Sequence, residues 1–128
     1  MTTMYEEHVM DHYKHPRNSG TISHPTIQFH DTNPLCGDEI TLTLRVDNDK
    51  ITAAKFTAKG CAISQAGASM LFEQLEGKTV REAIALDKQV ILDEFGTALS
   101  VSRVKCALLA LSAVKKSLAA NGARETEI

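Results

Sequence analysis

The sequence predicts a mixed fold in which a small β-sheet is covered by helices, and three observations predict it. Apolar and polar residues alternate strictly from Glu39 to Val46, which is the pattern of a half-buried strand. The turn-forming stretch 47–50 then leads into a second β-type run, 51–58, which predicts an antiparallel hairpin. Beyond residue 60, apolar residues instead recur every three or four positions, the period of an α-helix.

Two further elements precede the hairpin. An apolar stripe over residues 4–14 predicts a short amphipathic helix that ends before Pro16. The basic and turn-forming stretch 13–20 is interpreted as a solvated connector, with a partner-docking patch as the alternative. Residues 27–31 alternate weakly and predict a first strand. Inside the hairpin, a slip in the alternation at Ala53–Ala54 predicts a β-bulge.

Cap signals bound the helices in the second half of the chain. Helix starts are predicted at Cys61, at a capping box formed by Thr79 and Glu82, at Asp87, and at Ser100 or Ser102. The matching ends are predicted at Gly77, near Leu86, near Gly96 and at 121–122. Cys61 is therefore expected at the start of one helix, and Cys106 in about the first turn of the last one.

Length and composition indicate one soluble globular domain, 1–128, with a polar tail at 122–128 that is expected to fray. The formal net charge of -2 gives no general attraction to nucleic acid or to an anionic membrane. Three cysteines cannot all pair internally, which favours a reducing compartment. No signal-peptide pattern and no long apolar run is present, so a cytoplasmic protein is expected.

The residues that can carry chemistry gather around the three cysteines, Cys36, Cys61 and Cys106. No Cys-x-x-Cys pair is present, so a shared site has to be assembled by the fold. Asp38 follows Cys36 by two residues in a loop with a proline and a glycine, and both side chains can face one point. The positive end of a helix dipole favours thiolates at helix starts. Three sulfurs and one oxygen suit tetrahedral zinc, or an iron-sulfur cluster with incomplete thiolate ligation.

The histidines are a weaker signal for a metal site. His8 and His12 are four residues apart, which places them on one face of a helix, but no third ligand lies nearby in the sequence. We therefore interpret both as surface or packing residues.

Three sequence contexts resemble, in order, the cysteine motifs of the IscU/SufU/NifU-type iron-sulfur cluster assembly scaffolds. They are Asn-Pro-Leu-Cys-Gly-Asp at 33–38, Lys-Gly-Cys-Ala-Ile-Ser at 59–64 and Val-Lys-Cys-Ala at 104–107. The opening segment 5–20 shares the likeness, which covers nearly the whole chain up to about residue 116. The resemblance implies a compact α+β domain with a small, mainly antiparallel, three-stranded sheet packed on one face by several helices.

The resemblance also implies roles for single residues and for partners. Cys36, Asp38, Cys61 and Cys106 match the family's cluster or metal ligands, and Asp38 matches the aspartate that can ligate zinc and promote cluster release. A cysteine desulfurase would supply sulfur, and apo iron-sulfur proteins would receive the cluster, expected to be a transient [2Fe-2S] cluster. Zn²⁺ is the alternative or resting occupant.

The likeness mixes two branches of this family. Lys105 stands where IscU proteins have histidine and resembles the SufU branch, yet the SufU insertion between the second and third cysteines is missing. The segment 101–105 replaces the chaperone-recognition motif of IscU, which argues against a dedicated chaperone.

Three functional hypotheses follow. The first is a cluster assembly scaffold without turnover of its own, the second a zinc-dependent sulfur acceptor acting with a desulfurase, and the third a zinc-stapled fold without a transfer role. For the first two, Cys36 is the expected sulfur acceptor, because its loop has more reach than cysteines fixed at helix starts. Lys105 is expected to support the forming persulfide anion with its positive charge.

Overall fold

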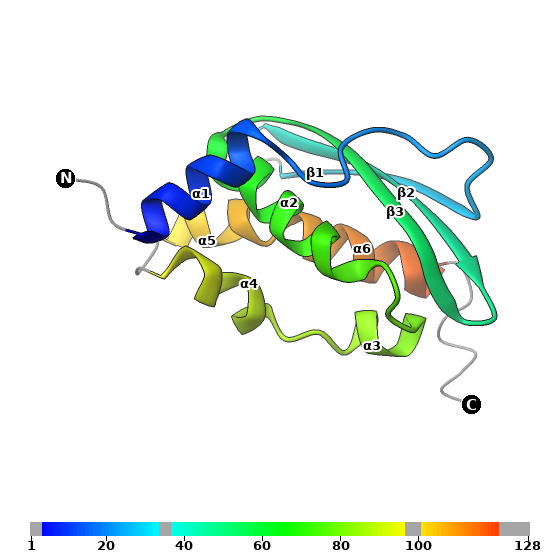
Figure 1. The fold of residues 1–128 in the computed structure, drawn as a ribbon. Helices are drawn as coiled ribbons and strands as arrows, with labels where there is room; N and C mark the ends of the chain where they lie inside the picture. The colour runs from blue at the N-terminus through cyan, green and yellow to red at the C-terminus, as the bar shows by residue number, and fades with distance from the viewer. Residues whose placement is uncertain (1–3, 34–36, 97–100, 121–128) are drawn as a thin grey trace.

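The structure is a computed structural model that describes residues 4–33, 37–96 and 101–120. A three-stranded antiparallel sheet forms one layer, and helices form the other (Figure 1). The described helices are α1 (Met4–Lys14), α2 (Ala62–Leu75), α3 (Val80–Ile84), α4 (Lys88–Phe95), α5 (Val101–Ala107) and α6 (Leu109–Ala120). The α+β class and the antiparallel three-stranded sheet expected from the sequence are confirmed.

The sheet has the order β1-β2-β3, so each strand pairs with its neighbour in the sequence. The strands are β1 (Ile27–Asn33), β2 (Asp38–Asp47) and β3 (Lys50–Lys59). Asn33 pairs with Asp38 at the end of the β1–β2 hairpin. The β2–β3 register shifts between Arg45 and Val46, and this shift leaves Thr52 as the extra residue of a bulge. The bulge falls one residue before the predicted position at Ala53–Ala54.

The helices cover one face of the sheet. Leu42, Leu44 and Phe56 point into the space between the layers, and none is more than 3% exposed. Helices α2 and α6 pack against this face (Figure 1), and the ring of Phe72 in α2 lies 5.0 Å from that of Phe56. Each such buried side chain contributes roughly 1.5–3 kcal/mol to folding.

The segment 15–26 connects α1 to β1 and pairs with the free edge of β3. The Gly20 N–H donates to the carbonyl of Phe56 at 2.8 Å, and the Phe56 N–H donates to the carbonyl of Asn18 at 3.0 Å. An unpaired edge would be a template for aggregation, and this pairing closes part of it. The segment therefore serves the sheet as a structural connector.

The predicted cap signals of α3 and α4 are confirmed. The Thr79 N–H donates to Glu82 Oε1 at 2.9 Å, and the Glu82 N–H donates to Thr79 Oγ1 at 3.0 Å, which is the predicted capping box. Asp87 caps α4, and Gly96 ends it in the left-handed conformation, with φ of 66°. Of the helices in the described ranges, none combines the length and the apolar character needed to cross a membrane.

The last helix differs from the prediction, because it is interrupted at Leu108 into α5 and α6. The interruption directly follows a close approach of α2: a Cβ added to Gly67 would lie 2.5 Å from the carbonyl oxygen of Ala107. Because α5 begins at Val101, Cys106 is the sixth of its seven residues and does not lie in the first helical turn. The expectation that a helix N-terminus stabilises its thiolate was therefore wrong.

Candidate metal centre

Three of the four predicted ligands lie at one end of the sheet. Asp38 is the first residue of β2, and Cys61 directly follows Gly60 at the end of β3. Because Glu39 pairs with Lys59, the start of β2 and the end of β3 are neighbours in the sheet. Antiparallel pairing thus brings Asp38 beside Cys61, although the two are 23 residues apart.

The Asp38 carboxylate contacts Cys61 twice. Its Oδ1 accepts a hydrogen bond from the Cys61 backbone N–H at 3.0 Å, and its Oδ2 accepts one from the Cys61 thiol at 3.3 Å. Asp38 is only 2% exposed, so this carboxylate is held in a largely dry position. Cys61 is the N-cap residue of α2, as predicted, and this residue is exposed.

Gly60 makes this contact sterically feasible. Its φ of +135° is unfavourable for residues with a side chain, and an added Cβ would overlap the Asp38 carboxylate. The glycine in the sequence Lys-Gly-Cys therefore leaves room for the carboxylate, a function that its position in the motif did not reveal.

Cys106 reaches the same point from α5. One donor atom from each of Asp38, Cys61 and Cys106 can be chosen so that all lie within 4.8 Å of one another. Cys106 is buried, with 5% of its surface exposed, whereas Cys61 is exposed to solvent. The group of Asp38, Cys61 and Cys106 therefore has a buried side and a side that is open to solvent. The close approach of α2 at Gly67 to Ala107 brings the helix of Cys106 against the helix that follows Cys61.

The donor set fits a tetrahedral zinc ion. Bonds of about 2.3 Å to sulfur and about 2.0–2.2 Å to oxygen require sulfur-oxygen separations of roughly 3.5 Å. The 3.3 Å between Cys61 Sγ and Asp38 Oδ2 is close to that value. Two thiolates and one carboxylate leave one tetrahedral position for a further donor, and the same sulfurs are suitable ligands for iron in a cluster.

Cys36 lies at 34–36, outside the described residues, so its predicted place in the site stays a prediction. The described residues that flank 34–36 are joined by a hydrogen bond: the Gly37 N–H donates to the carbonyl of Asn33 at 2.8 Å across the hairpin end. Cys36 is two residues from Asp38 along the chain, and the loop from which it was predicted to act connects β1 to β2.

Lys105 is exposed and lies beside Cys106 in the sequence. It lines a surface hollow of about 260 Å³ together with Asp31, Asn33 and Lys116, among others. Lys116 Nζ donates to Asp31 Oδ2 at 3.1 Å, so the charge of Lys116 is already paired in this hollow. Lys105 therefore places a positive charge near the strand end that leads to residue 36.

An α+β domain with thiol and carboxylate donors gathered at one end of its sheet has an arrangement that can hold a metal ion. The family described as the NifU-like N-terminal domain matches residues 4–127. The chain belongs to this family, which includes the IscU, SufU and NifU proteins.

Curated relatives match most of the chain. It is 35% identical to the "zinc-dependent sulfurtransferase SufU" of Bacillus subtilis (strain 168), over 93% of this chain and 92% of that protein. It is 36% identical to the "iron-sulfur cluster assembly scaffold protein IscU" of Haemophilus influenzae, over 90% of this chain and 93% of that protein.

A solved structure has the same fold. The crystal structure of a SUF-system iron-sulfur cluster assembly scaffold protein from Fervidobacterium islandicum AW-1 superposes with a TM-score of 0.76 at 33% identity. The similarity covers 88% of this chain and 94% of that one.

Proposed function

We propose that this chain is an iron-sulfur cluster assembly scaffold, on which iron and sulfide are assembled as cargo and then passed to apo-proteins. Cys36, Asp38, Cys61 and Cys106 are its proposed ligands. The observation that carries the proposal is the meeting of donor atoms from Asp38, Cys61 and Cys106 within 4.8 Å, although they come from separate elements. The names of the IscU and SufU relatives support the same function.

The mixture of ligands suits a cluster that has to leave. Thiolates bind iron firmly, whereas a carboxylate oxygen is a harder donor and holds it less firmly. Cys61 is exposed, so a thiolate of an acceptor protein has access to the cluster from that side. Exchange at Asp38 would then open the first coordination position for the acceptor, while the buried Cys106 still holds the cluster.

Sulfur would arrive as a persulfide from a cysteine desulfurase. The thiolate of Cys36 attacks the terminal sulfur of the desulfurase persulfide, the new S–S bond forms on Cys36, and the desulfurase cysteine leaves as a thiolate. An electron-donor protein and ferrous iron supply the electrons that reduce this sulfur to sulfide. Burial of Cys106 and the contacts of Cys61 with Asp38 leave Cys36 as the proposed acceptor. Lys105 would stabilise the persulfide anion by its charge.

A second candidate function is a zinc-dependent sulfurtransferase, in which zinc fills the site and sulfur is passed on without cluster assembly. The near-tetrahedral spacing of Cys61 Sγ and Asp38 Oδ2 favours it, as does the zinc-dependent SufU relative. Bound zinc would hold the thiolates in place and stabilise the fold through binding linkage.

Three further statements stay predictions from the sequence: a single domain spanning 1–128, a cytoplasmic location and the lack of a dedicated chaperone.

Mass spectrometry of single Cys→Ser variants tests the sulfur step. Each protein is exposed briefly to a desulfurase and cysteine, with either Zn²⁺ or Fe²⁺ present. We expect a persulfide in wild type and in Cys106→Ser, and its loss in Cys36→Ser. Persulfide at the wild-type level in Cys36→Ser and its absence in Cys106→Ser would transfer the acceptor role to Cys106.

A further inference from the structure

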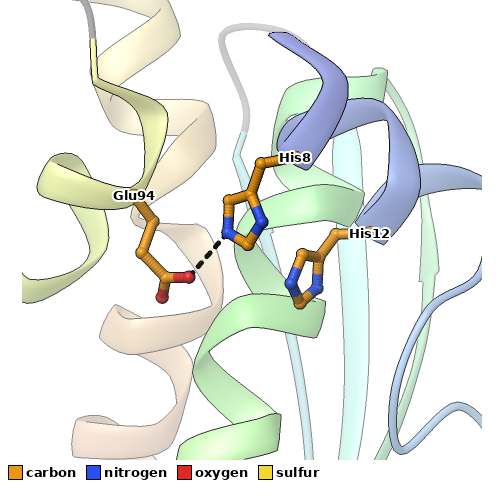
Figure 2. Close-up of side chains that lie close together, drawn as sticks. All are labelled: His8, His12 and Glu94. Carbon is orange, nitrogen blue, oxygen red and sulfur yellow. Dashed lines mark hydrogen bonds and ion pairs between the residues drawn. The ribbon is translucent and has the colours of Figure 1, made fainter. Parts of the chain in front are cut away.

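A second group of metal-ligating side chains lies outside the cysteine site. His8 and His12 are one turn apart on α1, and Glu94 reaches them from α4. One donor atom from each of the three can be chosen so that all lie within 4.8 Å of one another. Figure 2 shows the two rings side by side, with Glu94 across from His8. The third ligand that the sequence lacked near the histidines is thus supplied by a distant helix.

His12 is oriented as a metal-binding histidine would be. It is 1% exposed, and its Nδ1 lies 2.7 Å from Ser69 Oγ, which also accepts the backbone N–H of Arg17 at 2.8 Å. A ligating histidine characteristically uses its second ring nitrogen for such a bond. Nδ1 is engaged in this way, so Nε2 is the nitrogen left for an ion, and it faces Glu73 Oε1 at 3.8 Å.

The Glu94 carboxylate is also held from both sides. Its Oε1 lies 2.9 Å from His8 Nε2, and its Oε2 accepts a hydrogen bond from Gln74 Nε2 at 2.9 Å. The His8 and Glu94 side chains are 40% and 25% exposed, so an ion has access from solvent and both side chains can adjust. Glu73 adds a further carboxylate nearby, although its other oxygen faces Arg17 Nε at 3.8 Å.

The chemistry of this group differs from that of the cysteine site. Two imidazoles and a carboxylate, without sulfur, suit Zn²⁺ and similar divalent ions. Burial lowers the pKa of His12, which favours the neutral imidazole, the form that can bind a metal. Zinc bonds of about 2.0–2.2 Å place ligand atoms roughly 3.3 Å apart, so donor atoms that now lie within 4.8 Å of one another would have to move closer together by side-chain rotation.

We propose that His8, His12 and Glu94 form a second divalent-cation site that takes a zinc-class ion and pins α1 to α4. The ion would take the place of the hydrogen bond between His8 Nε2 and Glu94 Oε1, with the ring proton of His8 carried on Nδ1, and Gln74 and Ser69 would orient the ligands. The site is separate from the cysteine site in its residues and in its donor chemistry, and it does not depend on the proposed scaffold function.

Cobalt(II) and zinc titrations of the reduced, full-length protein at pH 7.5 test the proposal. Cobalt bound to thiolate shows an intense near-ultraviolet charge-transfer band, whereas cobalt at the histidine site shows only weak visible bands. We expect an equivalent of metal without the charge-transfer band in wild type and in the control His15→Ala, which removes an exposed histidine of the same region. His8→Ala and Glu94→Gln should bind that equivalent at least about tenfold more weakly.

Nuclear magnetic resonance of the wild-type imidazoles gives a readout that needs no variant. During zinc titration, the ring resonances of His8 and His12 should shift together, while those of His15 stay in place. A wild-type protein whose His8 and His12 resonances do not respond, or variants that keep the thiolate-free equivalent at wild-type affinity, would overturn the proposal.

Discussion

The backbone N–H of Cys61 donates to Asp38 Oδ1 at 3.0 Å, and Asp38 Oδ2 lies 3.3 Å from the sulfur of the same cysteine. The Asp38 carboxylate therefore contacts both the thiol and the backbone N–H of Cys61, which is the N-cap residue of α2. Negative charge at a helix N-terminus is stabilising, so Asp38 supports the helix whether or not a metal is bound. If Asp38 holds a metal as proposed, its release of that metal would be linked to movement of Cys61.

Gly60→Ala should displace Asp38 and weaken metal binding, because the new Cβ would overlap the carboxylate. We expect zinc affinity to fall at least about tenfold, with a loss of unfolding free energy of about 1–3 kcal/mol from backbone strain. Gly20→Ala is a matched control. Its φ of +132° is nearly that of Gly60, but its nearest neighbour is Lys55 Cδ at 3.7 Å. The control should lose stability and keep zinc; equal zinc affinity in both variants would contradict this explanation.

Asp38→Ala should lengthen the lifetime of a bound cluster and block its transfer, because the weakest ligand is removed as an exchange point. Asp38→Asn removes the charge but retains an oxygen that can accept the Cys61 N–H, so it separates the ligand role from the helix contact. Glu39→Gln, on the neighbouring residue of β2, is the charge-matched control. Visible absorption of the cluster with and without an apo-acceptor measures both effects. Faster cluster loss in Asp38→Ala would count against a labile ligand.

Local signals in the sequence predicted most elements. The capping box of Thr79 and Glu82, the cap at Asp87 and the alternation that predicts β2 act over a few residues, and the structure confirms both caps and the strand, although Thr43 is buried as well. The meeting of Asp38 with Cys61 could be anticipated only in outline, because it depends on strand register. The four-ligand set was predicted from the residue types and supported by the family resemblance; the structure brings three of its members together and does not describe Cys36.

The remaining features depend on tertiary contacts that no local pattern records. The break at Leu108 directly follows Ala107, which α2 approaches through Gly67, 40 residues earlier in the chain. Glu94 approaches His8 only because α4 folds back beside α1, with a sequence separation of 86. In the sequence, the group of His8, His12 and Glu94 was indicated only by the spacing of four residues between the two histidines.

Gly67→Ala should destabilise the protein by about 1–3 kcal/mol, since the added methyl would press against the Ala107 carbonyl. At an unhindered helix position, replacing glycine with alanine stabilises by roughly 0.5–1 kcal/mol, so the sign of the change is diagnostic. Urea unfolding followed by circular dichroism measures it. Stabilisation would show that α2 and α5 are not in close contact at this point.

The ion pair of Asp11 and Arg17 predicts a small pH dependence of stability. Arg17 Nη2 donates to Asp11 Oδ2 at 2.6 Å, and this hydrogen bond lowers the pKa of Asp11 below its ordinary value of 3.8. The pair's contribution is present above pH 3.8, where the carboxylate is charged in both the folded and the unfolded state. It is lost as the pH falls through the lowered folded-state pKa.

Carboxyl titration by nuclear magnetic resonance checks the cause of this shift. Arg17→Gln should return the pKa of Asp11 to about 3.8, whereas Arg45→Gln should leave the lowered value unchanged. An Asp11 that titrates at the same pH in wild type and in Arg17→Gln would show that the guanidinium is not responsible.

The scaffold proposal is tested most directly by anaerobic assembly with ferrous iron, a cysteine desulfurase, cysteine as the only sulfur source and an electron donor. We predict that wild type develops the visible absorption of an iron-sulfur cluster and loses it when an apo-ferredoxin gains an equal amount, while Cys61→Ser does neither. A wild-type protein that forms persulfide and binds zinc, but neither develops this absorption nor activates the acceptor, would contradict the proposal.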